Sequence, residues 1–251
     1  MELQALIFDV DGTIANTEEV HRETFNEIFS KYGLGWHWDR PLYHRLLKVT
    51  GGKERIRHYM ETTHPDMLSR PGLADWIAEL HREKTALYNQ RVLAGEIPLR
   101  AGVRRLMEEA RGLGVKLAIA TTTSRVNVES LLISALGADS LGWFSAWGTG
   151  ESSSQKKPHP GVYLKVLEEL NLPAQACLAL EDSANGLRSA AAAGIPVLIT
   201  VSPYTEEDDF SGAMAVTDGL GDPGQPPRWI QGGKSGMVSL ALLREWFRPS
   251  T

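Results

Sequence analysis

Apolar runs typical of buried strands alternate with helical patterns along most of this chain, and one long helical stretch interrupts the alternation. We interpret as strands the β-rich apolar runs at residues 3–8, 116–120, 144–147, 176–180, 196–201 and 213–217. Helical patterns follow at residues 103–113, 126–136, 161–170 and 186–193. This alternation predicts an α/β fold, a Rossmann-like parallel sheet with helices on both faces.

The stretch from about residue 18 to 95 contains no convincing strand. Its patterns indicate helices at residues 18–32, 40–47, 54–62 and 73–92. We therefore predict an inserted all-helical cap domain at residues 17–96, with residues 1–16 and 97–251 forming the catalytic core. The Gly- and Pro-rich residues 218–236 predict a surface loop, and residues 237–247 a terminal helix.

Composition narrows the classes of partner. The 251 residues are 42% apolar with a net charge of −5, which argues against a nucleic-acid surface. The single cysteine, Cys177, excludes an internal disulfide framework and fits a reducing compartment. No apolar run approaches 18 residues, and the first strand begins almost at once, without a signal-peptide pattern. We expect a soluble cytoplasmic monomer that does not bind membranes.

Two carboxylates, Asp9 and Asp11, follow the first predicted strand, and Gly12 permits the chain to turn there. Two like charges so close are unfavourable unless a cation lies between them or one carboxyl is protonated. The pair therefore indicates either a Mg²⁺ site or a nucleophile beside a general acid. The simpler alternative is an acidic turn that caps a helix.

Other polar side chains follow later predicted strands, at the edge where parallel α/β sheets bind ligands. The hydroxyls of Thr121, Thr122, Thr123 and Ser124 precede a helix, which suits an anion, although one of them alone could cap that helix. Lys157 could neutralise a phosphoryl oxygen, or it could belong to a solvated lysine pair. Glu181 and Asp182 form a second carboxylate pair, which suits Mg²⁺ or, at Asp182, a helix cap.

This order of an Asp-x-Asp pair, a Thr, a Lys and a final Asp resembles the haloacid dehalogenase superfamily over about residues 1–220. The resemblance implies that Asp9 is a nucleophile forming an aspartyl-phosphate and that Asp11 is the general acid and base. It implies that Thr121 and Lys157 bind the phosphate. It also implies Mg²⁺ ligands at Asp9, Asp11 and Asp182, with Glu181 at or near the metal.

The predicted cap carries basic and glycine residues that suit a second phosphate. Glu18 and His21 lie one turn apart on its first helix, and Gly51, Gly52, Lys53 and Arg55 open another helix. His81 and Lys84 fall in the apolar stripe of residues 73–92, where a cation needs a partner or extends to the rim. Arg125 could reach the same anion from the core. The alternative is a loop with solvated charges.

A helical insert at this position resembles the β-phosphoglucomutase-like branch of the superfamily. The motifs at residues 8–13, 17–21, 50–55, 120–124 and 180–183 resemble the CbbY-type phosphatases. That family dephosphorylates xylulose 1,5-bisphosphate, an inhibitor of the Calvin-cycle enzyme Rubisco. The resemblance implies a Mg²⁺-dependent phosphoric monoester hydrolase acting on that sugar bisphosphate. A β-phosphoglucomutase-type isomerase would use the same residues, and an inactive binding scaffold is a third alternative, which the intact Asp9 and Asp11 disfavour.

Overall fold

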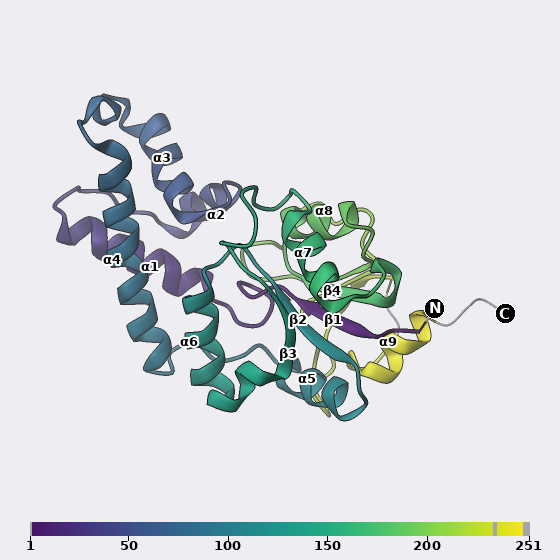
Figure 1. The fold of residues 1–251 in the computed structure, drawn as a ribbon. Helices are drawn as coiled ribbons and strands as arrows, with labels where there is room; N and C mark the ends of the chain where they lie inside the picture. The colour runs from purple at the N-terminus through teal and green to yellow at the C-terminus, as the bar shows by residue number, and fades with distance from the viewer. Residues whose placement is uncertain (1, 233–234, 248–251) are drawn as a thin grey trace. The chain divides into compact units, whose positions relative to one another are not determined.

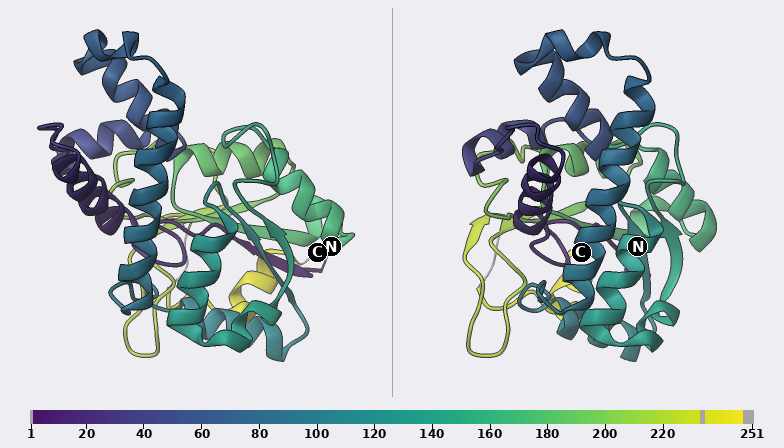
Figure 2. Two further views of the ribbon diagram at one scale, coloured as in Figure 1. Left: turned by 60° about the vertical axis from the view of Figure 1, so that its left-hand side comes forward. Right: turned by 90° about the vertical axis from the view of Figure 1, so that its left-hand side faces the viewer.

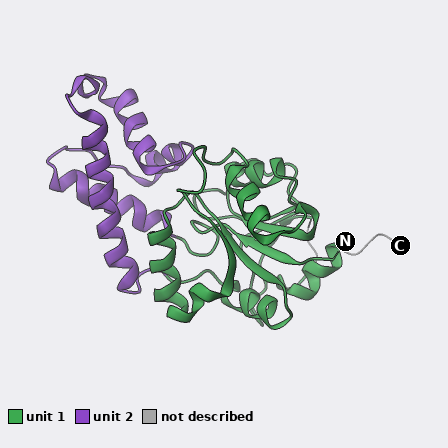
Figure 3. Ribbon diagram, in the orientation of Figure 1, with its two compact units in different colours: residues 1–16, 98–251 green, residues 17–97 purple. Residues whose placement is uncertain are grey.

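The computed structural model describes residues 2–232 and 235–247 in two compact units (Figure 3). Residues 1–16 and 98–251 form one, called here the core unit, and residues 17–97 form the other, called the helical unit. The chain thus leaves the core unit after the first strand and its loop and returns before the second strand. An antiparallel bridge between Ala15 and Leu99 pairs the two connecting segments inside the core unit.

A seven-stranded sheet forms the centre of the core unit, with the order β3-β2-β1-β4-β5-β6-β7. The strands are β1 (Ala5–Phe8), β2 (Lys116–Ala120), β3 (Phe144–Gly148), β4 (Cys177–Glu181), β5 (Val197–Thr200), β6 (Ala215–Thr217) and β7 (Trp229–Gln231). Neighbouring strands are parallel except β7, which runs antiparallel to β6. The predicted Rossmann-like fold class is confirmed.

Strand β7 corrects the prediction that residues 218–236 are only a loop; residues 233–234 of that stretch lie outside the described residues. The strand has three residues, too few to show an alternating pattern. It forms because Thr217 pairs with Trp229 and Val216 with Gln231. The Trp229 ring also lies edge-on to Trp246, with centroids 6.3 Å apart. These contacts are tertiary, so the local sequence does not reveal them.

Helices cover both faces of the sheet (Figure 1). Helices α7 and α8 lie on one face, and α5 and α9 lie on the other. Ile7 and Ala179 of the sheet share a buried cluster with Val166 and Leu187 of those first two helices. Strands buried on both faces are apolar throughout, which is why they were recognisable as continuous runs. The helices are α5 (Val103–Gly112), α6 (Arg125–Leu136), α7 (Gly161–Leu170), α8 (Ala184–Ala192) and α9 (Leu240–Trp246), with short 3₁₀ turns η2 (Ala138–Trp143) and η3 (Ala174–Ala176).

The helical unit contains no strand among its described residues, 17–97. Its elements are α1 (Glu18–Lys31), α2 (Arg40–Leu47), α3 (Gly52–Thr63), a 3₁₀ turn η1 (Pro65–Ser69) and α4 (Leu73–Leu93). Helix α4 packs against α1 and α3, and α3 also packs against α2 (Figure 2). Across both units, none of the described helices is long and apolar enough to span a membrane.

Strand order places the ends of three strands side by side. Strand β1 pairs with β2 on one side and with β4 on the other, so that Phe8 lies beside both Ile119 and Leu180. The strands are parallel, so their carboxyl ends meet at one edge of the sheet. Asp9, Thr121 and Asp182 each follow one of these strands, and Glu181 is the last residue of β4. The polar residues are therefore brought together by the register of the strands.

We predict that Trp38→Ala will destabilise the helical unit by about 3–5 kcal/mol, because a large buried ring is lost. Trp38 is fully buried, and its ring centroid lies 4.8 Å from those of both Phe25 and Phe29. Urea denaturation followed by circular dichroism measures the loss. The control is Trp143→Ala, which removes a half-buried ring of the core unit. An equal loss in both variants would show that Trp38 is not central to packing.

Candidate active site

A buried lysine joins the ends of three neighbouring strands. The Lys157 ammonium donates to Asp9 Oδ1 at 2.6 Å, to Glu181 Oε1 at 2.6 Å and to the carbonyl oxygen of Ala120 at 2.8 Å. Lys157 is only 6% exposed, and Asp9 and Glu181 are also buried. An ammonium has three protons, and these three bonds use all of them. Contact between Lys157 and a phosphoryl oxygen would therefore require one of these bonds to be exchanged.

Glu181 is held on both sides of its carboxylate. The hydroxyl of the fully buried Tyr163, on α7, donates to Oε1 at 2.5 Å. The other oxygen, Oε2, lies against Gly186 on α8, where an added Cβ would come within 1.9 Å of it. No side chain larger than hydrogen fits at that position unless Glu181 moves. The orientation of Glu181 is thus fixed by α7, by α8 and by Lys157.

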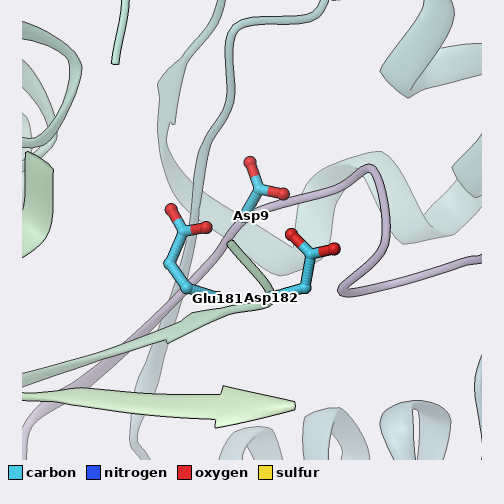
Figure 4. A group of neighbouring side chains, drawn as sticks. All are labelled: Asp9, Glu181 and Asp182. Atoms are coloured by element: carbon cyan, nitrogen blue, oxygen red, sulfur yellow. The ribbon is translucent and has the colours of Figure 1, made fainter. Parts of the chain in front are cut away.

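Three carboxylates converge at this edge of the sheet (Figure 4). Asp9, Glu181 and Asp182 are all buried, and each offers an oxygen within 4.8 Å of the others. In the part of the chain that the structure describes, this cluster sets three carboxylates beside the single ammonium of Lys157. Carboxylate oxygens are the ligands that Mg²⁺ prefers. The donor set and the excess of negative charge both fit a divalent cation.

Burial shapes the proton affinities in the cluster. Removal from water raises the pKa of Asp9 from 3.8 to about 7, against the attraction of Lys157 and together with the repulsion of Glu181 and Asp11. Burial alone would lower the pKa of Lys157, but the charges of Asp9 and Glu181 outweigh it and raise that pKa. Lys157 therefore stays protonated, whereas the carboxylate of Asp9 is costly to bury without a further cation.

Asp11 lies in the tight loop after β1 and is held from the end of β2. The Thr123 hydroxyl donates a hydrogen bond to Asp11 Oδ2. Thr121 is buried, and its own hydroxyl accepts from the backbone N–H of Thr123 at 3.2 Å. Gly12 has φ of 80°, a left-handed conformation that an L-residue adopts only at a cost. The structure thus places Asp11, Thr121 and Thr123 in one connected arrangement.

The other polar residues after β2 lie nearer the surface of the core unit. Thr122 and Ser124 are half-buried, and Ser124 precedes α6. Arg125 is exposed, pairs with Glu129 at 2.7 Å and stacks its guanidinium 3.9 Å from the ring centroid of Trp147. These contacts within the core unit account for the orientation of Arg125.

Within the helical unit, four of the predicted residues share one neighbourhood. The Lys84 ammonium forms a hydrogen bond with His21 Nδ1 and lies 4.9 Å from the ring centroids of both Phe25 and Tyr88. His21 stacks on Tyr88 at 4.0 Å. The other two residues, Gly52 and His81, meet at the start of α3. A Cβ added to Gly52 would lie 2.3 Å from His81 Nε2 and 3.4 Å from the Phe25 ring. We call His21, Gly52, His81 and Lys84 the cationic cluster.

The remaining predicted residues of the helical unit lie around this cluster or apart from it. Gly51 has φ of 103°, which suits glycine at the start of α3, and Lys53 is exposed beside it. Glu18 is buried at the start of α1. The guanidinium of Arg55 donates to the carbonyls of Leu46 and Val49 and to the hydroxyl of Tyr43, so it holds α2 to α3.

Sequence reasoning missed two residues that contact this machinery. Tyr163 falls in the helix predicted at residues 161–170, and a hydroxyl among its apolar neighbours is the one signal that this side chain needs a partner when buried. Arg100 lies in a segment without a motif, yet its side chain donates to the carbonyl oxygen of Gly12, next to Asp11. The sequence carries no local signal for that contact.

Comparison with known proteins identifies the family. The model of the haloacid dehalogenase-like hydrolases matches residues 3–194. The chain belongs to this family. It is 49% identical to the protein CbbY (plasmid) of Cupriavidus necator over 245 residues, which cover 97% of this chain and 96% of that one. The predicted resemblance to the haloacid dehalogenase superfamily and to CbbY proteins is confirmed, and so is the enzyme class, a phosphatase of the haloacid dehalogenase type.

Solved structures agree with the fold. A crystal structure of CbbY from Rhodobacter sphaeroides in complex with phosphate has a TM-score of 0.81 and 42% identity, covering 86% of this chain and 94% of that one. A mutant of that protein, in complex with xylulose-(1,5)bisphosphate, has a TM-score of 0.79 and 41% identity with the same coverage. This family member therefore shares the α/β core and most of its length with the present chain.

We predict that Asp9→Asn will raise the melting temperature of the metal-free protein at pH 8. The native state binds the Asp9 proton more tightly than the unfolded chain does, so the free energy of unfolding falls as pH rises from about 4 to about 7. The neutral amide removes this cost, and the gain should disappear toward pH 4. Differential scanning fluorimetry in EDTA across this range measures it.

The matched control for this prediction is Asp139→Asn, which neutralises an exposed aspartate of the core unit. This variant should show no comparable pH-dependent gain. A lower melting temperature for Asp9→Asn at pH 8 would contradict the prediction, because it would mean that the ion pair with Lys157 outweighs the cost of burial.

Proposed function

We propose that this chain is a Mg²⁺-dependent phosphatase that hydrolyses a sugar bisphosphate, with xylulose 1,5-bisphosphate as its substrate, through an aspartyl-phosphate at Asp9. The observation that carries the proposal is the buried cluster of Asp9, Lys157, Glu181 and Asp182 at the ends of β1 and β4. A second support is that a mutant of a 41% identical CbbY protein was crystallised in complex with xylulose-(1,5)bisphosphate.

In the proposed reaction, Asp9 attacks phosphorus and the bond to the sugar oxygen breaks. Asp11 donates its proton to that leaving oxygen and later takes a proton from the water that hydrolyses the aspartyl-phosphate. Lys157 holds the Asp9 carboxylate in place through its Oδ1 atom. The hydroxyl of Thr121 binds a phosphoryl oxygen. Inorganic phosphate leaves, and Asp9 is regenerated.

We assign Asp9, Asp182 and the backbone carbonyl oxygen of Asp11 to Mg²⁺, with Glu181 near the ion as the anchor of Lys157. When bound, the cation would offset the repulsion between these carboxylates and the incoming phosphate dianion. The raised pKa of Asp9 supports this assignment, because an uncompensated carboxylate at that position is unfavourable. Asp182 contributes a third buried carboxylate, 4% exposed.

The cationic cluster of the helical unit is our candidate for the second phosphate. Lys84 supplies the positive charge of this cluster, and its side chain is buried in the helical unit, 3% exposed. His21 and the rings of Phe25 and Tyr88 orient it. The N-terminus of α3 at Gly51 and Gly52 adds backbone N–H groups, and Lys53 adds a further positive charge.

We predict that xylulose 1,5-bisphosphate will give the highest kcat/KM among sugar mono- and bisphosphates, with release of inorganic phosphate. A monophosphate lacks the second anchor and should react more slowly. The reaction should stop in EDTA and resume with excess Mg²⁺. The assay follows free phosphate and the sugar product together over a substrate panel.

The same assay separates the phosphatase from a β-phosphoglucomutase-type isomerase. A mutase would convert glucose 1-phosphate to glucose 6-phosphate with little free phosphate. Isomerisation faster than phosphate release would overturn the phosphatase proposal while leaving Asp9 as nucleophile. Full activity in excess EDTA would overturn the assignment of Mg²⁺, and activity retained by Asp9→Asn would overturn the covalent mechanism.

We predict that Lys84→Met will lower kcat/KM for bisphosphates by about 10- to 100-fold, because a charge-assisted hydrogen bond is typically worth about 1.5–3 kcal/mol. Monophosphates should lose far less. Steady-state kinetics on one bisphosphate and its matching monophosphate measures the difference.

The control is Arg82→Met on the same helix, which removes an exposed cation paired with Glu79. It should leave both substrates almost unaffected. An equal loss of bisphosphate and monophosphate activity in Lys84→Met would show that Lys84 only maintains the packing of the helical unit.

A further inference from the structure

Arg100 donates to main-chain carbonyl groups of three separate segments of the core unit. Its Nη1 atom donates to the carbonyl oxygen of Gly12 and to that of Thr200 at 2.8 Å. Its Nη2 atom donates to the carbonyl oxygens of Val201 at 2.6 Å and Asp218 at 2.9 Å. The first segment is the loop after β1, the second is the carboxyl end of β5, and the third is the residue that follows β6. A guanidinium carries five N–H donors spread over a planar fork, enough for four separate carbonyl oxygens, whereas an ammonium has three donors on one atom.

The main chain around Arg100 holds the same loop. The backbone N–H of Arg100 donates to the carbonyl oxygen of Ile14 at 2.9 Å, and the preceding residue, Leu99, pairs with Ala15. Both the side chain and the backbone of this short segment are therefore bonded to residues 12–15. The bonds to Thr200 and Val201 tie that loop to the end of β5.

The loop held in this way carries Asp11. Hydrogen bonds within the loop hold its shape: the N–H of Gly12 donates to the carbonyl oxygen of Ala15 at 2.8 Å, and the N–H of Ile14 donates to that of Val10 at 2.9 Å. On the side of β2, the Thr123 hydroxyl donates to the carboxylate of Asp11. On the other side, Arg100 fixes the carbonyl of the very next residue, Gly12. The position of Asp11 is thus set from two directions.

We infer that Arg100 is a positioning residue for the general acid: it fixes the Gly12 carbonyl and so holds Asp11 where the leaving oxygen must be protonated. This inference rests on the proposed function, in which Asp11 supplies that proton. An acid must lie within hydrogen-bond reach of its target, and a misplacement of about 1 Å can cost on the order of 10²-fold in rate. Arg100 itself need not touch the substrate.

The test compares two substrates that differ in their need for the acid. A sugar phosphate has a poor leaving group that requires a proton. The leaving group of p-nitrophenyl phosphate is p-nitrophenolate, a stable anion that departs without one. The quantity measured is kcat/KM, which reports the steps up to formation of the aspartyl-phosphate. We expect Arg100→Met to lower kcat/KM about 10- to 100-fold for the sugar phosphate, and much less for p-nitrophenyl phosphate.

Arg105 provides a matched control on α5. Its guanidinium donates to the carbonyl oxygens of Gly221 at 2.7 Å and Val238 at 2.9 Å, and it pairs with Glu109 at 2.8 Å. The chemistry resembles that of Arg100, but the acceptors belong to the C-terminal segment and not to the loop of Asp11. Arg105→Met should lose stability without changing the ratio of the two kcat/KM values.

A second variant, Arg100→Lys, keeps the positive charge but has only three donors on one nitrogen, too few for the four carbonyl oxygens that Arg100 bonds. It should show the same selective loss to a smaller extent, and it allows the test if Arg100→Met folds poorly. Circular dichroism and melting temperature establish that each variant is folded. Equal losses on both substrates, as expected for damage to stability alone, would overturn the inference.

Asp11→Asn, assayed on the same two substrates, separates failure of the inference from failure of the proposed function. If Asp11→Asn does not discriminate between them, the acid role of Asp11 is wrong, and the inference falls with it. If Asp11→Asn loses the sugar phosphate selectively and both Arg100 variants do not, the proposed mechanism stands and only the role of Arg100 is overturned. Selective loss in all three variants supports both.

Discussion

The rest of the core site depends on the three hydrogen bonds that the buried Lys157 ammonium donates. It bonds at once to the carboxylates that end two adjacent strands and to the last carbonyl of a third, so it joins β1, β2 and β4 at one point. Removing one member would leave a buried charge without its partner, which is costly. The Tyr163 hydroxyl and the close contact with Gly186 extend this constraint into α7 and α8.

The same arrangement leaves the site short of positive charge. Lys157 balances one of the three carboxylates around it, and burial makes the ionised form of Asp9 unfavourable. Burying the Asp9 carboxylate therefore costs stability locally, a cost that the proposed role of Asp9 as nucleophile would explain. A divalent cation would be favoured in such a site, and once bound it would offset the repulsion between the carboxylates and an incoming phosphoryl group, which is how the electrostatics support phosphoryl transfer.

The two units differ in the polar groups that they bury. The core unit holds carboxylates and hydroxyls suited to a reacting phosphoryl group, whereas the helical unit buries the cationic Lys84 among aromatic rings beside His21. Neither arrangement is needed for packing alone, because apolar side chains would fill these positions at a lower cost of desolvation. Our proposal of a substrate with two anionic groups rests on this difference.

The sequence by itself determined the fold class, the helical insertion and the strand ends that carry Asp9, Asp11, Thr121 and Asp182, because burial on both faces of a strand leaves a readable apolar run. Only the tertiary structure decided which groups bond to one another. The donation from Tyr163 to Glu181, the contact between Arg100 and Gly12 and the pairing of β7 all join residues far apart in the chain. Periodicity encodes which face of an element is buried, but the partner of a buried polar group depends on strand order and register, which no local pattern contains.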